Sequence, residues 1–223
     1  MILYQGSKDI IVKPQYGGGK LHNDYGRGFY CTEDTGMASE WAVDENRDGY
    51  VNTYTIETDG LSIIDLNSKD FTILHWISVL ISNRIFELNS PLAREAYRYL
   101  TENFYVDVTS ADIIRGYRAD DSYFAFAQDF LNGQISLSQL SKALYLGKLG
   151  EQIVIKSKRT LNRLKYVESS EVFSNEWFQQ KKARDNRARL EYKKIGQTNY
   201  IPGDLYITRI IDEEIKANDP RIQ

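Results

Sequence analysis

The sequence predicts an α+β protein, because segments that alternate like β-strands stand on both sides of a block with helical periodicity. Residues 50–56 alternate between two faces and are rich in β-branched and aromatic side chains, which is typical of a strand. Residues 71–146 instead carry apolar side chains three and four positions apart, as helices do. A polar helix over residues 174–195 follows, so the simplest division is one domain with a helical tail.

Several further strands are expected along the chain. Residues 2–7 read as a short strand that runs into a turn, and Pro14 with the glycines at 17–19 predicts a loop. The Asp59-Gly60 turn joins the strand at 50–56 to a second at 61–66, which predicts a hairpin. Residues 150–155 form a mostly apolar strand with two polar residues at its start.

The helices carry recognisable start and stop residues. Asp34 or Thr35 caps a helix with Met37, Ala38, Trp41 and Ala42 on one face. Ser90 followed by Pro91 opens a helix that runs through residue 99. Helices are also expected at residues 71–81, 121–131 and 136–146, the last closed by Gly147.

Composition limits the class of protein. Cys31 is the one cysteine of the 223 residues, so an internal disulfide is impossible and a reducing compartment fits best. No apolar segment at the N-terminus resembles a signal peptide, and the most apolar window, 73–81, is too short to cross a bilayer. We therefore expect a cytoplasmic protein that is not bound to a membrane.

The net charge of −3 is unevenly distributed. Residues 156–194 hold 12 Lys and Arg against 5 Asp and Glu, a surplus of 7, which leaves 16 against 26 elsewhere. This basic segment favours an anionic partner, either nucleic acid or an acidic protein, and the alternative is a solvated helix face. The cations that would contact nucleic acid are Lys181, Lys182, Arg184, Arg187 and Arg189.

The most informative stretch is Asp24-Tyr25-Gly26-Arg27-Gly28-Phe29-Tyr30-Cys31-Thr32. Gly26 and Gly28 allow a tight turn with room beside the backbone for a flat or anionic ligand. If a strand follows, Phe29 and Tyr30 point to opposite faces, one toward the core and one toward a cleft. The alternative interpretation is a β-turn with a buried aromatic side chain.

Four stretches together resemble a bacterial family of uncharacterised ADP-ribosyltransferase-like domains, which is often found in toxin–antitoxin loci. They are Leu3-Tyr4-Gln5-Gly6-Ser7, Asp24 to Thr32, Gly116-Tyr117-Arg118-Ala119-Asp120-Asp121-Ser122-Tyr123-Phe124 and Leu149-Gly150-Glu151-Gln152-Ile153-Val154. That family is similar to the diphtheria-toxin and poly(ADP-ribose) polymerase branch, which uses a His-Tyr-Glu triad on a split β-sandwich. The resemblance covers residues 2–167.

The resemblance implies a fold and an activity. The expected fold is an ADP-ribosyltransferase-like split β-sandwich with a helical insertion over residues 1–167, followed by a basic helical tail over residues 168–223. NAD is the implied co-substrate, and a protein, a nucleic acid or a small nucleotide is the acceptor. A toxin or defence effector is the implied role, and an acidic antitoxin is then the protein partner that would compete with nucleic acid for the basic segment. The alternatives are an NAD glycohydrolase and a non-enzymatic module that binds NAD or nucleic acid through a degenerate triad.

The triad position on the strand at 150–155 has two candidates. Breaking the nicotinamide–ribose bond builds positive charge on the ribose, so a polar side chain beside the 2′-hydroxyl is needed. Glu151 can hydrogen-bond and supply negative charge, whereas Gln152 can only hydrogen-bond, and strand alternation turns them to opposite faces. The polymerase branch favours Glu151 and the closer family favours Gln152, which we prefer. Glu151 is then a solvent-facing strand residue.

The remaining site residues also follow from the resemblance. Gln5 stands where the related branch has histidine, and together with Gly6 and Ser7 it would bind NAD. Tyr30 would stack on the nicotinamide ring, and Arg27 beside Gly28 would bind the pyrophosphate through paired hydrogen bonds. Arg27 could equally be an exposed turn residue.

A second polar cluster, made of Arg118, Asp120 and Asp121, precedes a helix and would border the cleft and hold NAD or the acceptor. Either aspartate could instead serve as a helix N-cap. His22 and His75 are too isolated to form a metal site. The acidic residues Asp212, Glu213, Glu214 and Asp219 lack the spacing of metal ligands and are expected in a solvated tail.

Overall fold

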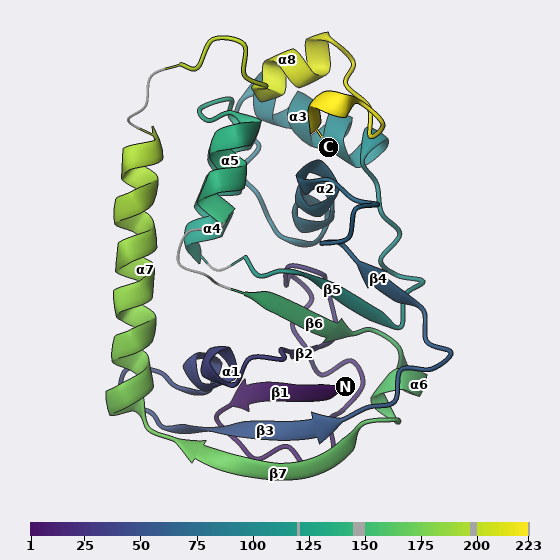
Figure 1. Ribbon diagram of the computed structural model, residues 1–223, viewed down its shortest axis with the longest axis vertical. Helices are drawn as coiled ribbons and strands as arrows, with labels where there is room; N and C mark the ends of the chain where they lie inside the picture. Colours follow the sequence, from purple (N-terminus) through teal and green to yellow (C-terminus); the bar gives the residue numbers. More distant parts are fainter. Residues whose placement is uncertain (120, 145–149, 197–199, 223) are drawn as a thin grey trace. The chain divides into compact units, whose positions relative to one another are not determined.

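The computed structural model describes residues 1–119, 121–144, 150–196 and 200–222, which form seven strands and eight α-helices (Figure 1). The strands make two sheets of three and four strands, so the expected mixed α+β class is confirmed. The chain divides into two compact units. The sheet unit comprises Met1–Asp65, Asp107–Arg118 and Leu149–Arg184, and the helical unit comprises Leu66–Val106, Ala119–Lys148 and Asp185–Gln223.

The first sheet is antiparallel, with β3 (Gly49–Thr55) between β1 (Ile2–Ser7) and β7 (Lys165–Val172). The strands expected at 2–7 and 50–56 are therefore confirmed. Gln5 of β1 stands opposite Asn52 of β3, which places their side chains on the same face of the sheet.

The second sheet has the order β2 (Phe29–Cys31), β6 (Glu151–Ile155), β5 (Ile113–Tyr117) and β4 (Ile63–Asp65). Its pairs are antiparallel except for β4 and β5, which run parallel. An isolated bridge between Tyr4 and Thr32 links β1 to the segment directly after β2. Leu3, Cys31, Ile113, Ile153 and Ile155 form a buried apolar cluster with Phe29 packed against it.

Helix α1 (Thr35–Ala42) lies against the first sheet at very short range. Asp34 caps it, since its Oδ1 accepts a hydrogen bond from the backbone N–H of Met37 at 2.9 Å. A Cβ atom on Gly6 would stand 1.9 Å from the carbonyl oxygen of Ala38. Gly6 is therefore required by the packing of α1 on β1. The sheet unit also contains α6 (Lys158–Leu161).

The helical unit contains α2 (Ile73–Asn83), α3 (Pro91–Asn103), α4 (Asp121–Leu131), α5 (Leu137–Leu144) and α8 (Ile207–Asp212), with a short 3-10 helix η2 (Pro220–Ile222). Ser90 caps α3 as expected, accepting from the N–H of Ala93 at 3.0 Å. Helix α7 (Ser174–Gly196) supplies its residues up to Arg184 to the sheet unit and the rest to the helical unit. Gly147, expected to close a helix, lies outside the described residues.

The predicted hairpin of residues 50–56 and 61–66 is wrong. Gly60 does adopt a left-handed turn at φ 72°, but β4 then pairs with β5 in the second sheet. Parallel strands need a long crossover, and α2 and α3 provide it between β4 and β5. The local turn was recognisable, whereas the pairing depended on residues 113–115, about fifty positions further on.

Five elements were not expected from the sequence: β5, α6, β7, α8 and η2. β7 is a polar edge strand without regular alternation, and the expected division after residue 167 falls inside it. Among the acidic residues at 212–219, Asp212, Glu213 and Glu214 are exposed as expected. The segment is packed rather than a free tail, because Glu213 and Asp219 pair with Arg221 and the nearby Ile210 and Ile215 are buried. On α7 the expected apolar position Leu190 is exposed, and Ala188 is buried instead.

Candidate functional site

A cavity of about 630 Å³ lies in the sheet unit, within the size range of small-molecule sites. Its walls come from β1, from the loop between β1 and β2 and from β2 itself. The lining residues are Gln5, Ile10, Ile11, Val12, Lys13, Pro14, Gln15, Gly18, Gly19, Gly28, Phe29 and Tyr30. The structure therefore brings Gln5 to the same cavity as Gly28 and Tyr30, although the long loop between β1 and β2 separates it from them in the sequence.

Two residues of β3 hold the loop wall of this cavity. The backbone N–H of Ile11 donates to Oδ1 of Asn52 at 2.9 Å, and its carbonyl accepts from the Tyr54 hydroxyl at 2.5 Å. Both side chains are fully buried. Because Ile11 is fixed through both of its peptide groups, the wall is preorganised rather than loose. Sequence reasoning placed Asn52 and Tyr54 only as strand residues, although an asparagine in mid-strand is itself unusual.

Asn52 also orients Gln5 and Ser7. Its Nδ2 lies 3.1 Å from Oε1 of Gln5 and 3.1 Å from Oγ of Ser7. The Gln5 Nε2 donates to the carbonyl of Gly6 at 2.9 Å, so the amide is held at both ends. Ser7 is not among the cavity-lining residues and instead helps to shape the start of the loop.

Tyr30 lines the cavity, and its hydroxyl is bound to the turn that precedes β2. The hydroxyl donates to the carbonyl of Gly26 at 2.6 Å and accepts from the N–H of Tyr25 at 3.1 Å. The expected free polar group is therefore occupied by the preceding turn, where Gly26 adopts φ 70°. A ring held in this way suits stacking against a flat ligand.

Strand register separates Glu151 from Gln152. Tyr30 stands opposite Val154, and Gln152 follows Val154 at the strand period of two, so Tyr30 and Gln152 share one face. Glu151 belongs to the other face, with Cys31 and Ile153. Gln152 is nevertheless buried and does not line the cavity itself.

The Gln152 amide is fixed by a carboxylate that sequence reasoning did not single out. Its Nε2 lies 2.6 Å from Oδ2 of Asp24 and 3.3 Å from the carbonyl of Tyr117. Because both partners are acceptors, they assign the nitrogen and use both amide hydrogens, which leaves Oε1 as an acceptor. Asp24 is itself buried at 5% exposure.

Tyr25 also belongs to the cluster of side chains around Gln152. Its hydroxyl donates to the Tyr117 carbonyl at 2.7 Å, and a Cβ on Gly116 would stand 2.2 Å from that hydroxyl oxygen. Its carbonyl accepts from Nζ of Lys156 at 2.6 Å, and burial lowers the pKa of that lysine. The Asp24-Tyr25-Gly26 turn therefore contacts Gln152, Tyr30 and Lys156 together.

Glu151 is engaged in ion pairing. Its Oε2 lies 2.9 Å from Nη1 of Arg115, whose Nη2 lies 2.6 Å from Oε2 of Glu33. The side chain of Glu151 is 41% exposed. This pairing gives Glu151 a structural role on the face of the sheet away from Tyr30.

Arg27 is exposed and lines a smaller cavity of about 50 Å³ together with Lys156. That cavity shares Gln15, Gly28 and Phe29 with the larger one, so the two adjoin. Two cationic side chains thus stand at one end of the candidate site.

Of the expected Arg118, Asp120 and Asp121 cluster, the structure describes only the side chain of Arg118. The Arg118 guanidinium lies over the ring of Trp41, 5.4 Å from its centroid. Asp120 lies outside the described residues, and Asp121 is the first residue of α4.

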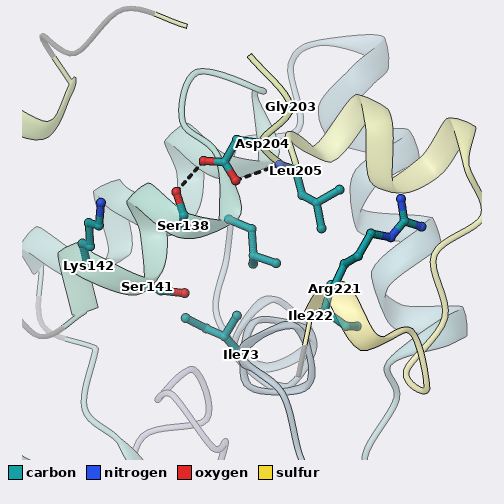
Figure 2. Close-up of a pocket in the computed structure, with 10 residues that line it drawn as sticks. Ile73, Ser138, Ser141, Lys142, Gly203, Asp204, Leu205, Arg221 and Ile222 are labelled. Atoms are coloured by element: carbon teal, nitrogen blue, oxygen red, sulfur yellow. Dashed lines mark hydrogen bonds between the residues drawn. The ribbon is translucent and has the colours of Figure 1, made fainter. Parts of the chain in front are cut away.

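A second cavity, of about 580 Å³, lies in the helical unit (Figure 2). Ile73, Leu137, Leu205 and Ile222 supply apolar walls, with Ser138, Ser141, Lys142 and Arg221 among the polar lining residues. Asp204 accepts from Ser136 at 2.5 Å and also from Ser138. Ser136 directly precedes α5, and its Oγ accepts from the N–H of Gln139 at 3.3 Å. This cavity contains none of the residues expected to bind NAD.

The described part of the chain contains neither a cluster of side chains that could hold a metal ion nor a helix that could span a membrane. Within residues 1–119, 121–144, 150–196 and 200–222, no three His, Cys, Asp or Glu side chains are arranged to hold a metal ion. No helix in that part of the chain has the length and apolar character needed to span a bilayer.

Comparison with known proteins gives one match. A family model described as "Protein of unknown function (DUF3990)" matches residues 1–166, and the chain belongs to this family. No curated protein and no solved structure matches the chain. The first cavity and its Asp24 cluster lie within the matched residues.

Proposed function

We propose that this protein is an NAD-dependent ADP-ribosyltransferase with a split β-sandwich of the ADP-ribosyltransferase type. The observation that carries the proposal is the shared face of β2 and β6, which holds both Tyr30 and Gln152, together with the cavity that Tyr30 and Gln5 line. This arrangement supports the motif resemblance at three separate positions of the chain. The resemblance further favours a toxin or defence effector.

The residues present suit NAD in size and chemistry. A cavity of about 630 Å³ accommodates a small molecule, the Tyr30 ring offers a stacking surface, and the Gln5 amide offers polar contacts. Arg27 and Lys156 stand at the adjoining small cavity, where cations would suit a pyrophosphate. In this proposal the nicotinamide side lies at Tyr30 and the phosphates lie toward Arg27.

In the proposed reaction, ADP-ribose is transferred by nucleophilic substitution at ribose C1′. The bond from ribose C1′ to nicotinamide breaks, nicotinamide leaves with the electron pair, and an acceptor nucleophile bonds to C1′ and loses its proton. Gln152 would accept a hydrogen bond from a ribose hydroxyl through Oε1, while Asp24 holds its amide in that orientation. Asp24 is thus a positioning residue in this proposal.

A non-enzymatic NAD-binding module is the second candidate. Gln5 and Gln152 are both amides, so neither brings the charge that stabilises a positive ribose. Binding by stacking and hydrogen bonds would survive this change, whereas turnover would be slower.

The test measures nicotinamide release from NAD by the purified chain, with and without cell lysate, together with thermal unfolding in the presence of NAD. The transferase predicts release that lysate accelerates, because lysate supplies the acceptor. Release unaffected by lysate would indicate a glycohydrolase, and a raised melting temperature without release would indicate the binding module. Labelled NAD followed by protease or nuclease digestion identifies the acceptor. Absence of both binding and release contradicts the proposal.

A further inference from the structure

The outward side of α7 in the helical unit is strongly basic. Between residues 186 and 194 the exposed positions are Asn186, Arg187, Arg189, Leu190, Lys193 and Lys194. Four of these six are cationic and none is acidic. We call Arg187, Arg189, Lys193 and Lys194 the basic face.

Packing holds the opposite side of the helix in place. Ala188 is buried, and the ring of Tyr192 stacks on Phe126 with centroids 3.7 Å apart. The Tyr192 hydroxyl lies 2.5 Å from Oδ2 of Asp129. The rotation of α7 about its axis is therefore fixed, and the basic face is held toward solvent as a preorganised surface.

The structure also limits which expected cations belong to such a surface. Arg184 pairs with Glu40 at 2.8 Å, and its side chain is only 17% exposed. It therefore contributes to packing in the sheet unit. Lys181 and Lys182 likewise belong to the part of α7 in the sheet unit.

Helix energetics alone do not account for the basic face. Lysines in the last turn complement the partial negative charge of the helix C-terminus, which explains Lys193 and Lys194. That effect is confined to the last turn, and Arg187 and Arg189 lie about two turns before the end of the helix at Gly196. Arg187 and Arg189 are two positions apart and stand at the two edges of the exposed side, so the four cations together span that side.

The composition of the face indicates its partner. Protein–protein interfaces are depleted in lysine and enriched in aromatic residues, whereas this face has two lysines and no exposed aromatic side chain. A helix that lies on a membrane needs an apolar side, and Leu190 is the one exposed aliphatic residue here. Closely spaced arginine and lysine side chains suit repeated phosphates. We propose that the basic face binds the phosphate backbone of nucleic acid.

This proposal does not rest on the proposed NAD chemistry. The basic face lies beyond residue 166, where the family match ends, and its binding is measured without NAD. Failure of nucleic-acid binding and failure of NAD turnover are therefore separate outcomes.

The test compares two variants of equal charge. The first replaces Arg187, Arg189, Lys193 and Lys194 with Gln, which keeps a similar helix propensity. The control replaces four other exposed lysines with Gln: Lys8, Lys69, Lys158 and Lys165. Fluorescence anisotropy with a labelled duplex DNA of about 20 base pairs, and with a single-stranded RNA of about that length, is recorded from about 50 to 200 mM salt.

The wild-type chain is expected to bind one or both probes with an affinity that falls steeply as salt rises. Removing the four cations should weaken binding at least tenfold at about 100 mM salt and reduce the slope of log K against log salt by about 3 to 4. The control variant should stay within about twofold of wild type, although its net charge changes equally.

Three results would overturn the proposal: absence of binding by the wild type at low salt, equal losses in the two variants, or displacement of the probe by poly-L-glutamate at equal charge concentration. The last result would indicate an acidic protein as the partner. Circular dichroism of both variants verifies that α7 remains helical.

Discussion

At the scale of single residues, the candidate site depends on how the side-chain amide of Gln152 is oriented. Asp24 and the Tyr117 carbonyl use both amide hydrogens, so the amide oxygen is oriented by a buried carboxylate 2.6 Å away. Because glutamate carries the negative charge that glutamine lacks, Gln152→Glu would be expected from the sequence position alone to raise NAD hydrolysis. The position of Asp24 changes that expectation, because the new carboxylate would face another one.

Gln152→Glu should therefore destabilise the fold. Two buried carboxylates at hydrogen-bond distance cannot both be ionised cheaply, and we expect a loss of about 3 kcal/mol in the free energy of unfolding near pH 8. The loss should shrink as the pH falls, since one carboxylate can then hold a proton. Denaturant unfolding at pH 8 and pH 5 measures this difference.

The double variant Asp24→Asn with Gln152→Glu provides the matched control. It exchanges the positions of donor and acceptor, so the hydrogen bond between residues 24 and 152 is retained with a single negative charge. We expect it to recover most of the stability that Gln152→Glu alone loses. A double variant no more stable than Gln152→Glu alone would show that the contact between Asp24 and Gln152 does not determine the free energy of unfolding.

The buried carboxylate of Asp112 makes the stability of the fold depend on pH in the acid range. Arg159 and Ser157 donate to it and hold its pKa well below the ordinary value, with Arg159 the larger cause. A lowered pKa in the folded state stabilises the protein above the unfolded-state pKa of about 4, and this contribution is lost as the pH falls below it.

Asp112→Asn should consequently cost about 2 kcal/mol at pH 7, and its difference from wild type should diminish toward pH 2. Urea unfolding across that range gives the comparison. Asp107→Asn is a useful control, because its pKa is also lowered but its partners Thr109 and Ser110 are local and solvent-exposed. A difference for Asp112→Asn that is constant with pH would contradict the role assigned to the Arg159 pair.

At the scale of elements, β3 supports the loop that walls the cavity. Asn52 contacts Gln5 and Ser7, accepts from Ile11, and also accepts from Ser169 of β7 at 2.7 Å. Asn52→Leu keeps the volume but removes these bonds. We expect a stability loss of about 2 kcal/mol and a more open loop over residues 8–20.

Limited trypsin digestion detects this opening without any assumption about function, because Lys20 lies in that loop and is followed by leucine rather than proline. Asn52→Leu should be cut there at least tenfold faster than wild type. Thr53→Val, a change at the neighbouring position on the other face of β3, should leave the cleavage rate nearly unchanged. Equal rates in the two variants would show that Asn52 does not hold the loop.

Sequence patterns were sufficient for elements whose information is local. Periodicity and caps gave α3, α4 and the start of α1, and alternation gave β1 and β3. They failed where pairing decided the structure: β4 joins a distant strand, and β7 is polar because it lies at a sheet edge. Asp24 could not be assigned in advance, since its role depends on β6 arriving opposite β2 after more than a hundred residues.

At the scale of the whole molecule, the two compact units are each assembled from three separate segments of the chain. A boundary chosen along the sequence cannot separate them, because α2 and α3 lie between β4 and β5 in the sequence, and α4 and α5 lie between β5 and β6. The family match reaches residue 166, while β7 and the first part of α7 still belong to the sheet unit.

Truncation after residue 166 should therefore give an unstable chain. It removes most of β7, which pairs along the whole length of β3, and it removes Trp177 and Phe178, which pack against the Ala38 cluster. Truncation after Arg184 removes only residues of the helical unit. We expect the first truncation to abolish cooperative unfolding of the sheet unit, and the second to retain its transition, as measured by circular dichroism during heating.

The central claim is that Gln152, and not its neighbour Glu151, faces the ribose of NAD. The most direct measurement is the rate of nicotinamide release by Gln152→Ala and Glu151→Gln, each with its melting temperature recorded. We predict that Gln152→Ala lowers the rate about 10²- to 10³-fold, and that Glu151→Gln stays within about twofold of wild type because it only loosens a partly exposed ion pair. The reverse order, or full activity in both folded variants, would contradict the account.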